Sequence, residues 1–231
     1  MGSVEEATAR LEQIRSRGYL LIGELDDHPS LWQKAYEESK YVDFVGCHAL
    51  QTSTETLAQT LRRYNPHVLV FRNDLAVLPE RRPVKQADNQ ITIFLGAVNR
   101  QADAQEILPL VNRVLLEYGD RIHMIVMCDR NFYAALNTAD KELVGQEYPG
   151  GYAPYEVYIK TLRRADIALL PLKDTLFNRS KSDLKFIESA ACGAVVLASP
   201  TVYEETVLDG KTGFIYRSKR QFAQKLRRLI D

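Results

Sequence analysis

Short apolar runs alternate with amphipathic helical segments along this chain, and this alternation limits its fold more than any other feature. Apart from Thr92 and His123, the runs at residues 91–95, 122–127 and 167–170 are apolar over consecutive residues rather than at every second residue. Such runs are typical of strands with both faces buried. The segment 103–118, which follows the first run, carries apolar residues at helical spacing. The pattern predicts an α/β fold with a parallel sheet covered by helices on both faces.

Two groups of elements are expected, separated by a proline-containing stretch at residues 72–90. In the first group we expect helices at 4–17, 31–39 and 52–64 and strands at 19–22, 42–47 and 68–71. In the second we expect strands at 91–95, 122–127, 143–148, 167–170, 194–198 and 213–216. The helices of the second group are expected at 103–118, 131–136, 155–164, 182–191, 202–207 and 218–230.

The proline-containing stretch predicts the domain organisation. Residues 1–75 are expected to form a partial N-terminal α/β segment, residues 76–90 a linker, and residues 91–231 a second α/β domain. Three strands are few for an independent doubly wound domain, so we expect the N-terminal half to be truncated. The opening Met1, Gly2 and Ser3 would then be a cloning remnant.

Composition excludes several functional classes. Lys plus Arg equals Asp plus Glu, at 30 each, so no global charge favours nucleic acid. The three cysteines form no CxxC motif, and the four histidines have no metal-ligand spacing. The sequence shows no signal peptide and no apolar stretch of membrane-spanning length. We therefore predict a cytoplasmic protein with reduced thiols, without a metal or a cofactor.

Ligands of open parallel sheets bind at the carboxyl ends of the strands. This rule directs attention to the loop before the expected helix 182–191, where Lys181 and Lys185 would oppose the helix dipole. Positive charges at this end of a helix are unfavourable, but a bound anion would make them favourable. Ser182 could cap the helix or donate to a phosphate oxygen. Glu188 is suited to accept from two adjacent hydroxyls. An exposed Lys185–Glu188 ion pair is the competing interpretation.

One face of the same expected helix should pack on the sheet. Its residues are Leu184, Ile187 and Ala191, which are three to four positions apart.

Three segments in this region resemble the nucleotide-sugar-binding half of GT-B glycosyltransferases of the retaining family-4 type. They are ADIALLPL, FNRSKSDLKFIESAACGAVVLASP and YEETVLDGKTGFIY, in this order. Earlier segments, GYLLIGELDDHP and FVGCHALQTSTETLAQTLRRYNPHVLVFRND, are similar to the end of the acceptor-side half. The resemblance implies a GT-B-like fold with Rossmann-type sheets. It also implies metal-independent transfer of a sugar from a nucleotide-diphospho-sugar to a glycan or similar acceptor, as in polysaccharide biosynthesis.

The resemblance also implies roles for individual residues. Glu188 would hold the ribose of the donor, and Tyr152 would meet its base. Cations would hold the diphosphate and stabilise it as it leaves; they are Arg100 (beside Asn99), Lys181 and Lys185. Ser180 stands where the family has a glutamate that touches the donor sugar, so that contact would be changed or carried by Asn178, Lys181 or Ser182. This departure supports an alternative, a non-catalytic or truncated module that binds a nucleotide or a protein partner.

Other polar groups have two interpretations each. Glu24, Asp26 and Asp27 are a possible metal or general-base site, but an acceptor-side or structural role is favoured. Asp129 either lines the cleft or caps a helix.

Two further segments also have two interpretations. Residues 203–205 either approach the sugar or belong to a surface helix. The cations of residues 218–230 either touch an anionic membrane or form a solvated face. A flavodoxin-like or response-regulator-like domain also fits the alternation of strands and helices, but leaves the Lys181–Glu188 pattern without an explanation.

Overall fold

The protein forms two compact units in the computed structural model, which describes residues 3–80, 82, 90–96, 100–149 and 152–231. Unit 1 comprises Met1–Asn73 together with Asp174–Ser182, and unit 2 comprises Asp74–Lys173 together with Asp183–Asp231. The predicted boundary near residue 75 lies close to the first change of unit. The return of Asp174–Ser182 to unit 1 was not predicted, because that segment lies inside a continuous run of strand and helix signals.

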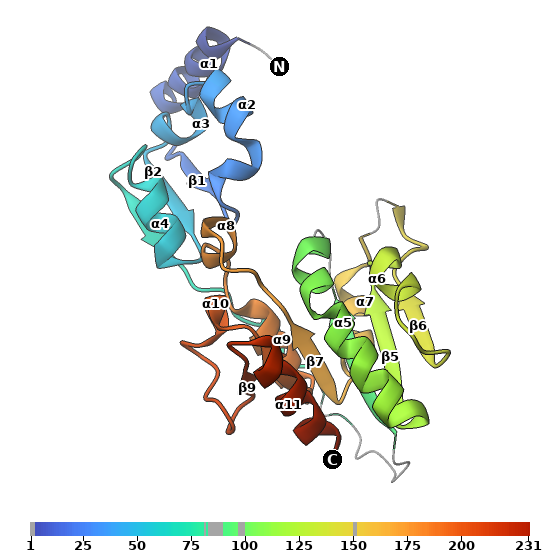
Figure 1. Cartoon of the computed structure of the whole chain (residues 1–231). Helices are drawn as coiled ribbons and strands as arrows, with labels where there is room; N and C mark the ends of the chain where they lie inside the picture. Colours follow the sequence, from blue (N-terminus) through green and yellow to red (C-terminus); the bar gives the residue numbers. More distant parts are fainter. Residues whose placement is uncertain (1–2, 81, 83–89, 97–99, 150–151) are drawn as a thin grey trace. The chain divides into compact units, whose positions relative to one another are not determined.

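Unit 1 is built on a three-stranded parallel sheet in the order β1-β2-β3. Its strands are β1 (Ile22–Glu24), β2 (Ala49–Thr52) and β3 (Val68–Val70). Its helices are α1 (Val4–Ser16), η1 (Pro29–Trp32), α2 (Gln33–Glu38), α3 (Val42–Val45), α4 (Glu55–Leu61) and α8 (Leu176–Arg179) (Figure 1). Leu50 of β2 and Leu57 of α4 are central to a small core in which both are almost fully buried.

The expected strand at residues 42–47 is wrong, because α3 occupies it and the strand begins at Ala49. A single helical turn places Val42 and Phe44 in the core, and Phe44 packs among the rings of neighbouring tyrosines. Asn65 fixes this turn by donating to the carbonyls of Phe44 and Cys47, both at 3.0 Å. A short apolar run does not distinguish a strand from a helical turn, so tertiary contacts decide.

Unit 2 contains a six-stranded parallel sheet in the order β6-β5-β4-β7-β8-β9. The strands are β4 (Ile91–Gly96), β5 (Ile122–Met127), β6 (Lys141–Val144), β7 (Ile167–Leu170), β8 (Val195–Ala198) and β9 (Phe214–Ile215). The helical elements are α5 (Gln101–Tyr118), η2 (Gly119–Arg121), α6 (Arg130–Ala134), α7 (Tyr155–Leu162), α9 (Leu184–Ala191), α10 (Pro200–Tyr203) and α11 (Lys219–Ile230). The predicted α/β class with a parallel sheet is confirmed.

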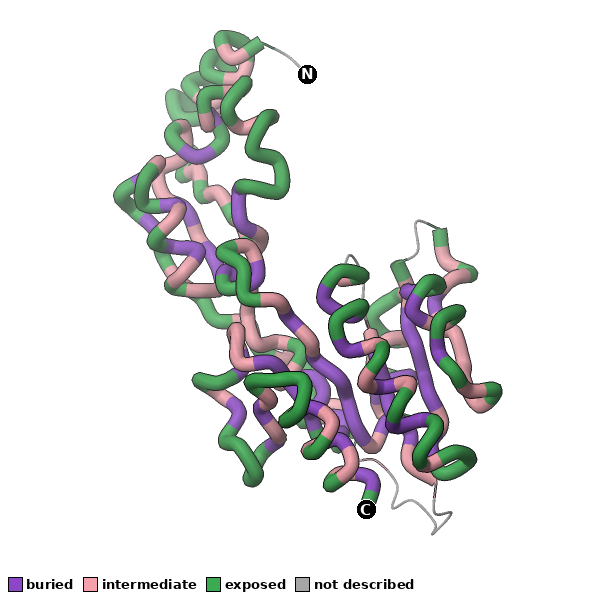
Figure 2. The backbone as a smooth tube through the Cα atoms, in the orientation of Figure 1, coloured by how far each residue is buried: buried purple, intermediate pink, exposed green. Residues whose placement is uncertain are grey.

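The central strands of unit 2 are buried on both faces, as their apolar runs predict. In β4, Ile93 and Leu95 face a core that includes α5 and α11, whereas Phe94 faces a second core that includes α7. Figure 2 shows β5 and β7 as buried along most of their length. Gly193 ends α9 with a φ of +81°, a conformation in which glycine avoids the strain of a side chain.

The last helix, α11, uses several of its cations inside unit 2. Lys225 contacts Asp209 at 2.7 Å, Arg227 contacts Glu117 at 2.7 Å, and Arg228 lies over the Phe214 ring. These contacts support a structural role for that face. No helix within the described ranges combines the length and the apolar character that crossing a bilayer requires.

Candidate functional site

The strand order of unit 2 creates a switch point between β4 and β7. From β4 the chain runs outwards through β5 to β6, and then returns to place β7 on the other side of β4. At such a point the loops that leave the two strands diverge, and a crevice opens at their carboxyl ends. The residues that follow β4 and β7 are therefore the first candidates for ligand contact in unit 2.

Arg100 stands at this edge, as the N-cap residue of α5. Its side chain is 23% exposed, and its Nη1 atom lies 3.7 Å from Oδ2 of Asp103. Asp103 in turn accepts from the backbone N–H of Lys173, 2.8 Å away in the loop after β7. The first turn of α5 and the loop after β7 are thus tied together by a buried carboxylate beside a partly exposed guanidinium. Asn99, which was predicted to stand next to Arg100, lies outside the described residues.

Helix α9 carries Glu188, the residue predicted to bind ribose. It is only 2% exposed. Two groups converge on its Oε2 atom: the hydroxyl of Tyr158 donates from 2.9 Å, and the ammonium of Lys185 donates from 3.0 Å. The Tyr155 hydroxyl is a further neighbour of this carboxylate: burial raises the pKa of Tyr155, and the charge of Glu188 and a hydrogen bond to it add to this effect. One oxygen of the carboxylate is thus held in place by two donors, and a carboxylate has lone pairs on both oxygens with which to accept further hydrogen bonds.

Tyr158 links this carboxylate to the core. Its ring packs 6.1 Å from that of Phe94, and the Lys185 ammonium lies 4.0 Å above it. Burial raises the pKa of Tyr158 well above its ordinary value, and the neighbouring charge of Glu188 adds to this effect. Tyr158 therefore remains a hydrogen-bond donor. The ion pair expected as the competing interpretation exists, but its carboxylate is buried and it belongs to a three-residue cluster.

The face of α9 that packs inwards is not the predicted one. Glu188, Ser189 and the adjoining Cys192 are buried, whereas Leu184, Ile187 and Ala191 are only partly buried. Because Tyr158 and Lys185 satisfy the carboxylate, a polar face can be buried at low cost.

The expected start of this helix at Ser182 is also wrong. The helix begins at Leu184, and its N-cap residue Asp183 makes no side-chain capping bond. Ser182 does not cap it: its Oγ atom accepts from Nδ2 of Asn73 at 2.8 Å within unit 1. A short helix, α8, precedes this point, with Thr175 as its N-cap residue. The polar sequence of that segment was interpreted as a loop, although its threonine cap was a usable signal.

Four of the residues predicted to contact the nucleotide-sugar lie in α8 or in the residues just after it, and these belong to unit 1. Lys181 forms an ion pair with Asp27 and lies 4.5 Å from the centre of the Phe177 ring. Ser180 is fully buried and donates to the carbonyl of Leu176 at 2.9 Å. Asn178 is 5% exposed within the helix, and Ser182 bonds Asn73. The other described candidates, Arg100, Tyr152, Lys185 and Glu188, belong to unit 2.

Two further candidates, Asp129 and Tyr152, lie next to the helices α6 and α7. Asp129 caps α6, because its Oδ1 atom accepts from the N–H of Phe132 at 2.9 Å. Tyr152 is 60% exposed in the stretch before α7. Within the described residues no group of three or more Asp, Glu, His or Cys side chains is arranged to hold a metal ion.

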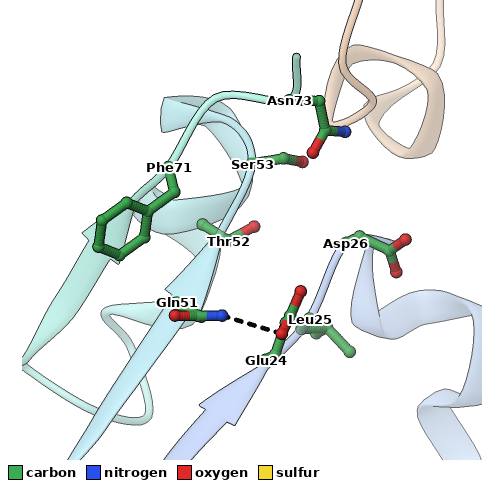
Figure 3. Close-up of a pocket in the computed structure, with 8 residues that line it drawn as sticks. All are labelled: Glu24, Leu25, Asp26, Gln51, Thr52, Ser53, Phe71 and Asn73. Carbon is green, nitrogen blue, oxygen red and sulfur yellow. Dashed lines mark hydrogen bonds between the residues drawn. The ribbon is translucent and has the colours of Figure 1, made fainter. Parts of the chain in front are cut away.

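Unit 1 has a cavity of its own, with a volume of about 90 Å³, at the carboxyl ends of its three strands (Figure 3). Glu24 and Asp26, two of the carboxylates that the sequence singled out, line it. The third, Asp27, is instead paired with Lys181. Thr52, Ser53 and Asn73 also line the cavity but were not predicted, since isolated hydroxyl and amide residues carry no distinctive sequence pattern.

Comparison with solved structures defines the fold class. The structure of trehalose-6-phosphate synthase OtsA is similar with a TM-score of 0.64 and 12% identity, over 95% of this chain and 62% of that one. A UDP-forming trehalose-phosphate synthase from Burkholderia xenovorans gives 0.61 and 12%, over 96% and 63%. TarM from S. aureus gives 0.59 and 11%, over 83% and 39%. These likenesses confirm the predicted GT-B fold.

The family follows from the sequence itself. The model of the family Glycosyl transferases group 1 matches residues 89–231, which is more than half of the chain. The chain therefore belongs to this glycosyltransferase family, as the sequence resemblance indicated. It spans about three fifths of the length of the synthase structures that it resembles. A comparison with curated protein sequences finds no significant match.

Proposed function

We propose that this chain takes part in the transfer of a sugar from a nucleotide-diphospho-sugar to a hydroxylated acceptor, with the donor bound by unit 2. The observation that carries the proposal is the buried Glu188 in the second turn of α9, held through its Oε2 atom by Tyr158 and Lys185. A carboxylate only accepts hydrogen bonds, and such a group suits two adjacent donors, such as the hydroxyls of a ribose. Membership of the family supports the same assignment.

Two cations of unit 2 are proposed to hold the diphosphate: Arg100 at the switch point and Lys185 on the first turn of α9. The Lys185 side chain is 46% exposed, so its ammonium can turn towards a phosphate while the Tyr158 hydroxyl still holds Glu188. A fixed positive charge stabilises the negative charge that develops on a leaving diphosphate, so these residues would support transfer without a metal. Tyr152, being exposed near α7, is proposed to stack on the base.

Lys181 requires a rearrangement to join such a site. Its ammonium is paired with Asp27, and its side chain is only 18% exposed. To reach a phosphate it would have to exchange one carboxylate for another anion. We propose Lys181 as a conditional contact of the donor.

Ser180 favours a second candidate function, nucleotide binding without turnover. The residue is fully buried and its hydroxyl is committed to the carbonyl of Leu176. The family's glutamate at this position would contact the donor sugar, whereas this serine has no carboxylate and its hydroxyl already donates to the backbone. The residues of this chain therefore support binding of the nucleotide-sugar more strongly than they support catalysis of sugar transfer.

Calorimetric titration of the full chain with the diphosphates of adenosine, guanosine, uridine and cytidine tests the proposal. We expect one of them to bind, and Arg100→Ala and Lys185→Ala each to weaken that binding by about tenfold, the loss of one charge-assisted contact. Arg130→Ala, at the start of α6, is the matched control. If none of the four nucleotides binds, the donor-site assignment is refuted.

Hydrolysis of the corresponding nucleotide sugar then separates the two candidate functions. Release of free sugar would support the glycosyltransferase function. Binding of the nucleotide sugar without release of sugar would support nucleotide binding without catalysis.

The remaining expectations belong to the same proposal. The three cysteines are free thiols, which supports a reducing, cytoplasmic environment. A glycan acceptor and a role in polysaccharide synthesis are proposed from the family alone.

A further inference from the structure

Glu188 is covered by its neighbours in unit 2, since it is only 2% exposed. A ribose hydroxyl can bond only to a carboxylate that it can touch, so one of the covering groups must move when a nucleotide binds. Three side chains surround the carboxylate. Tyr158 and Lys185 donate to its Oε2 atom, and the hydroxyl of Tyr155 is a further hydrogen-bonding neighbour. The surroundings of each side chain decide which of them can move away.

Tyr158 is the fixed member of the three. Its ring packs 6.1 Å from that of Phe94, on the core side of the carboxylate. A full helical turn of α7 precedes it, and such a turn excludes one of the staggered side-chain rotamers. Lys185 is half-exposed and is the cation proposed to turn towards a phosphate. Tyr155 is left as the group whose movement has no role in the proposed site.

Tyr155 is the first residue of α7 and is 54% exposed. No helical turn precedes this position, so the rotamer that is excluded later in the helix is open to it. Its ring lies 6.1 Å from the Tyr158 ring, because residues three apart on a helix are neighbours. The two hydroxyls therefore meet the same carboxylate, one from a buried ring and one from a ring that can swing into water.

We propose that the Tyr155 hydroxyl occupies a hydrogen-bonding place on Glu188 that a ribose hydroxyl takes when a nucleotide binds, so that Tyr155 is an internal competitor of the ribose. A phenol and a ribose hydroxyl are both O–H donors, and they compete for the same carboxylate lone pairs. The ligand must displace Tyr155, which lowers its apparent affinity. This role rests on the proposed binding of a nucleotide by unit 2, and it concerns a residue that no pattern in the sequence singled out.

Tyr155→Phe tests the competition, because it keeps the ring and removes only the hydroxyl. The full chain is titrated calorimetrically with the tightest-binding ribonucleoside diphosphate and with its 2′,3′-dideoxy analogue. We expect the ribonucleotide to bind about fivefold more tightly to the variant, the value of one hydrogen bond that no longer has to be broken. The dideoxy analogue does not compete for Glu188, so its affinity should not change.

The neighbouring tyrosine gives a control of opposite sign. Tyr158→Phe removes the hydroxyl that holds Glu188 in place, so it should weaken binding of the ribonucleotide. Tyr118→Phe, at the other end of α5 from Arg100, removes a hydroxyl bonded to Asp231 on the exposed surface and should leave both affinities unchanged.

A second measurement tests the contact without any nucleotide. Tyr155 is replaced by 3-fluorotyrosine in the full chain, and its pKa is measured from the fluorine resonance as the pH is raised. The charge of Glu188 opposes ionisation of a neighbouring phenol. Glu188→Gln should therefore lower the pKa at position 155.

Either of two results overturns the role of Tyr155. One is a ribonucleotide affinity that Tyr155→Phe leaves unchanged or weakens, and the other is an equal pKa at position 155 with Glu188 and with Gln. Both results leave the donor site intact, because the ribonucleotide still binds in the first and is absent from the second. If none of the four nucleoside diphosphates binds, the donor site itself is refuted, and the competition for Glu188 is refuted with it.

Discussion

Replacing Tyr158 by phenylalanine isolates the contact that holds Glu188. The ring remains to pack near Phe94, and only the hydroxyl that donates to Oε2 from 2.9 Å is lost. A hydrogen bond to a charged group is worth about 1.5–3 kcal/mol. Lys185 still contacts the same oxygen at 3.0 Å, so we expect a loss near the lower end, about 1.5–2 kcal/mol. For a domain of this size that corresponds to roughly 3–8 °C in melting temperature.

The matched control is Tyr118→Phe, which removes a tyrosine hydroxyl bonded to Asp231 at 3.0 Å on the exposed surface. Surface changes of this kind usually alter stability by no more than about 0.5 kcal/mol. Hydrogen exchange of peptides covering α9 and β8, compared between the two variants, measures the difference locally. Equal protection of these peptides in both variants would show that burial does not strengthen the Tyr158–Glu188 contact, and would refute the reasoning.

Two further predictions concern unit 1. Burial, with a smaller effect of Arg63, lowers the pKa of His28 below its ordinary value of 6.5. The unfolded chain therefore takes up a proton first as pH falls through 6.5, so unit 1 should lose stability from pH 7 towards pH 5. In His28→Asn, which keeps an acceptor for the N–H of Ser30, the urea midpoint followed by Trp32 fluorescence should vary less with pH; an unchanged slope contradicts this. Asn65→Ala should destabilise unit 1 by about 3 kcal/mol, because it orphans the backbone groups that its amide satisfies. A loss of stability below about 0.5 kcal/mol, as expected for an exposed position, would show that these hydrogen bonds of Asn65 do not stabilise unit 1.

The fold of unit 2 was predictable because its strands are buried on both faces. Consecutive apolar residues, as in β7, leave few alternatives, and the helices between them have clear periodicity. Unit 1 was harder, because its strands have three or four residues and its core is small. There the segment at Val42 became a helical turn because aromatic packing and the Asn65 bonds outweighed the local preference for a strand.

The candidate site was only partly predictable. Glu188 and Lys185 were found because a charge spacing on one helix and a family motif coincide at them. The Tyr158 hydroxyl was missed, since its meeting with Glu188 depends on the packing of α7 beside α9, which no local pattern encodes. The commitment of Lys181 to Asp27 was missed for the same reason, as 154 residues separate the partners.

The role of Glu188 is tested most directly by comparing a ribonucleoside diphosphate with its 2′,3′-dideoxy analogue. The tightest-binding nucleotide is titrated calorimetrically into the wild-type chain and into Glu188→Gln, which keeps the size of the side chain. We expect the wild type to prefer the ribose form by at least about tenfold, as two hydrogen bonds to a carboxylate require, and Glu188→Gln to lose most of that preference. Equal affinity of the wild type for both nucleotides, or a preference that survives in Glu188→Gln, would contradict the claim that Glu188 binds the donor ribose.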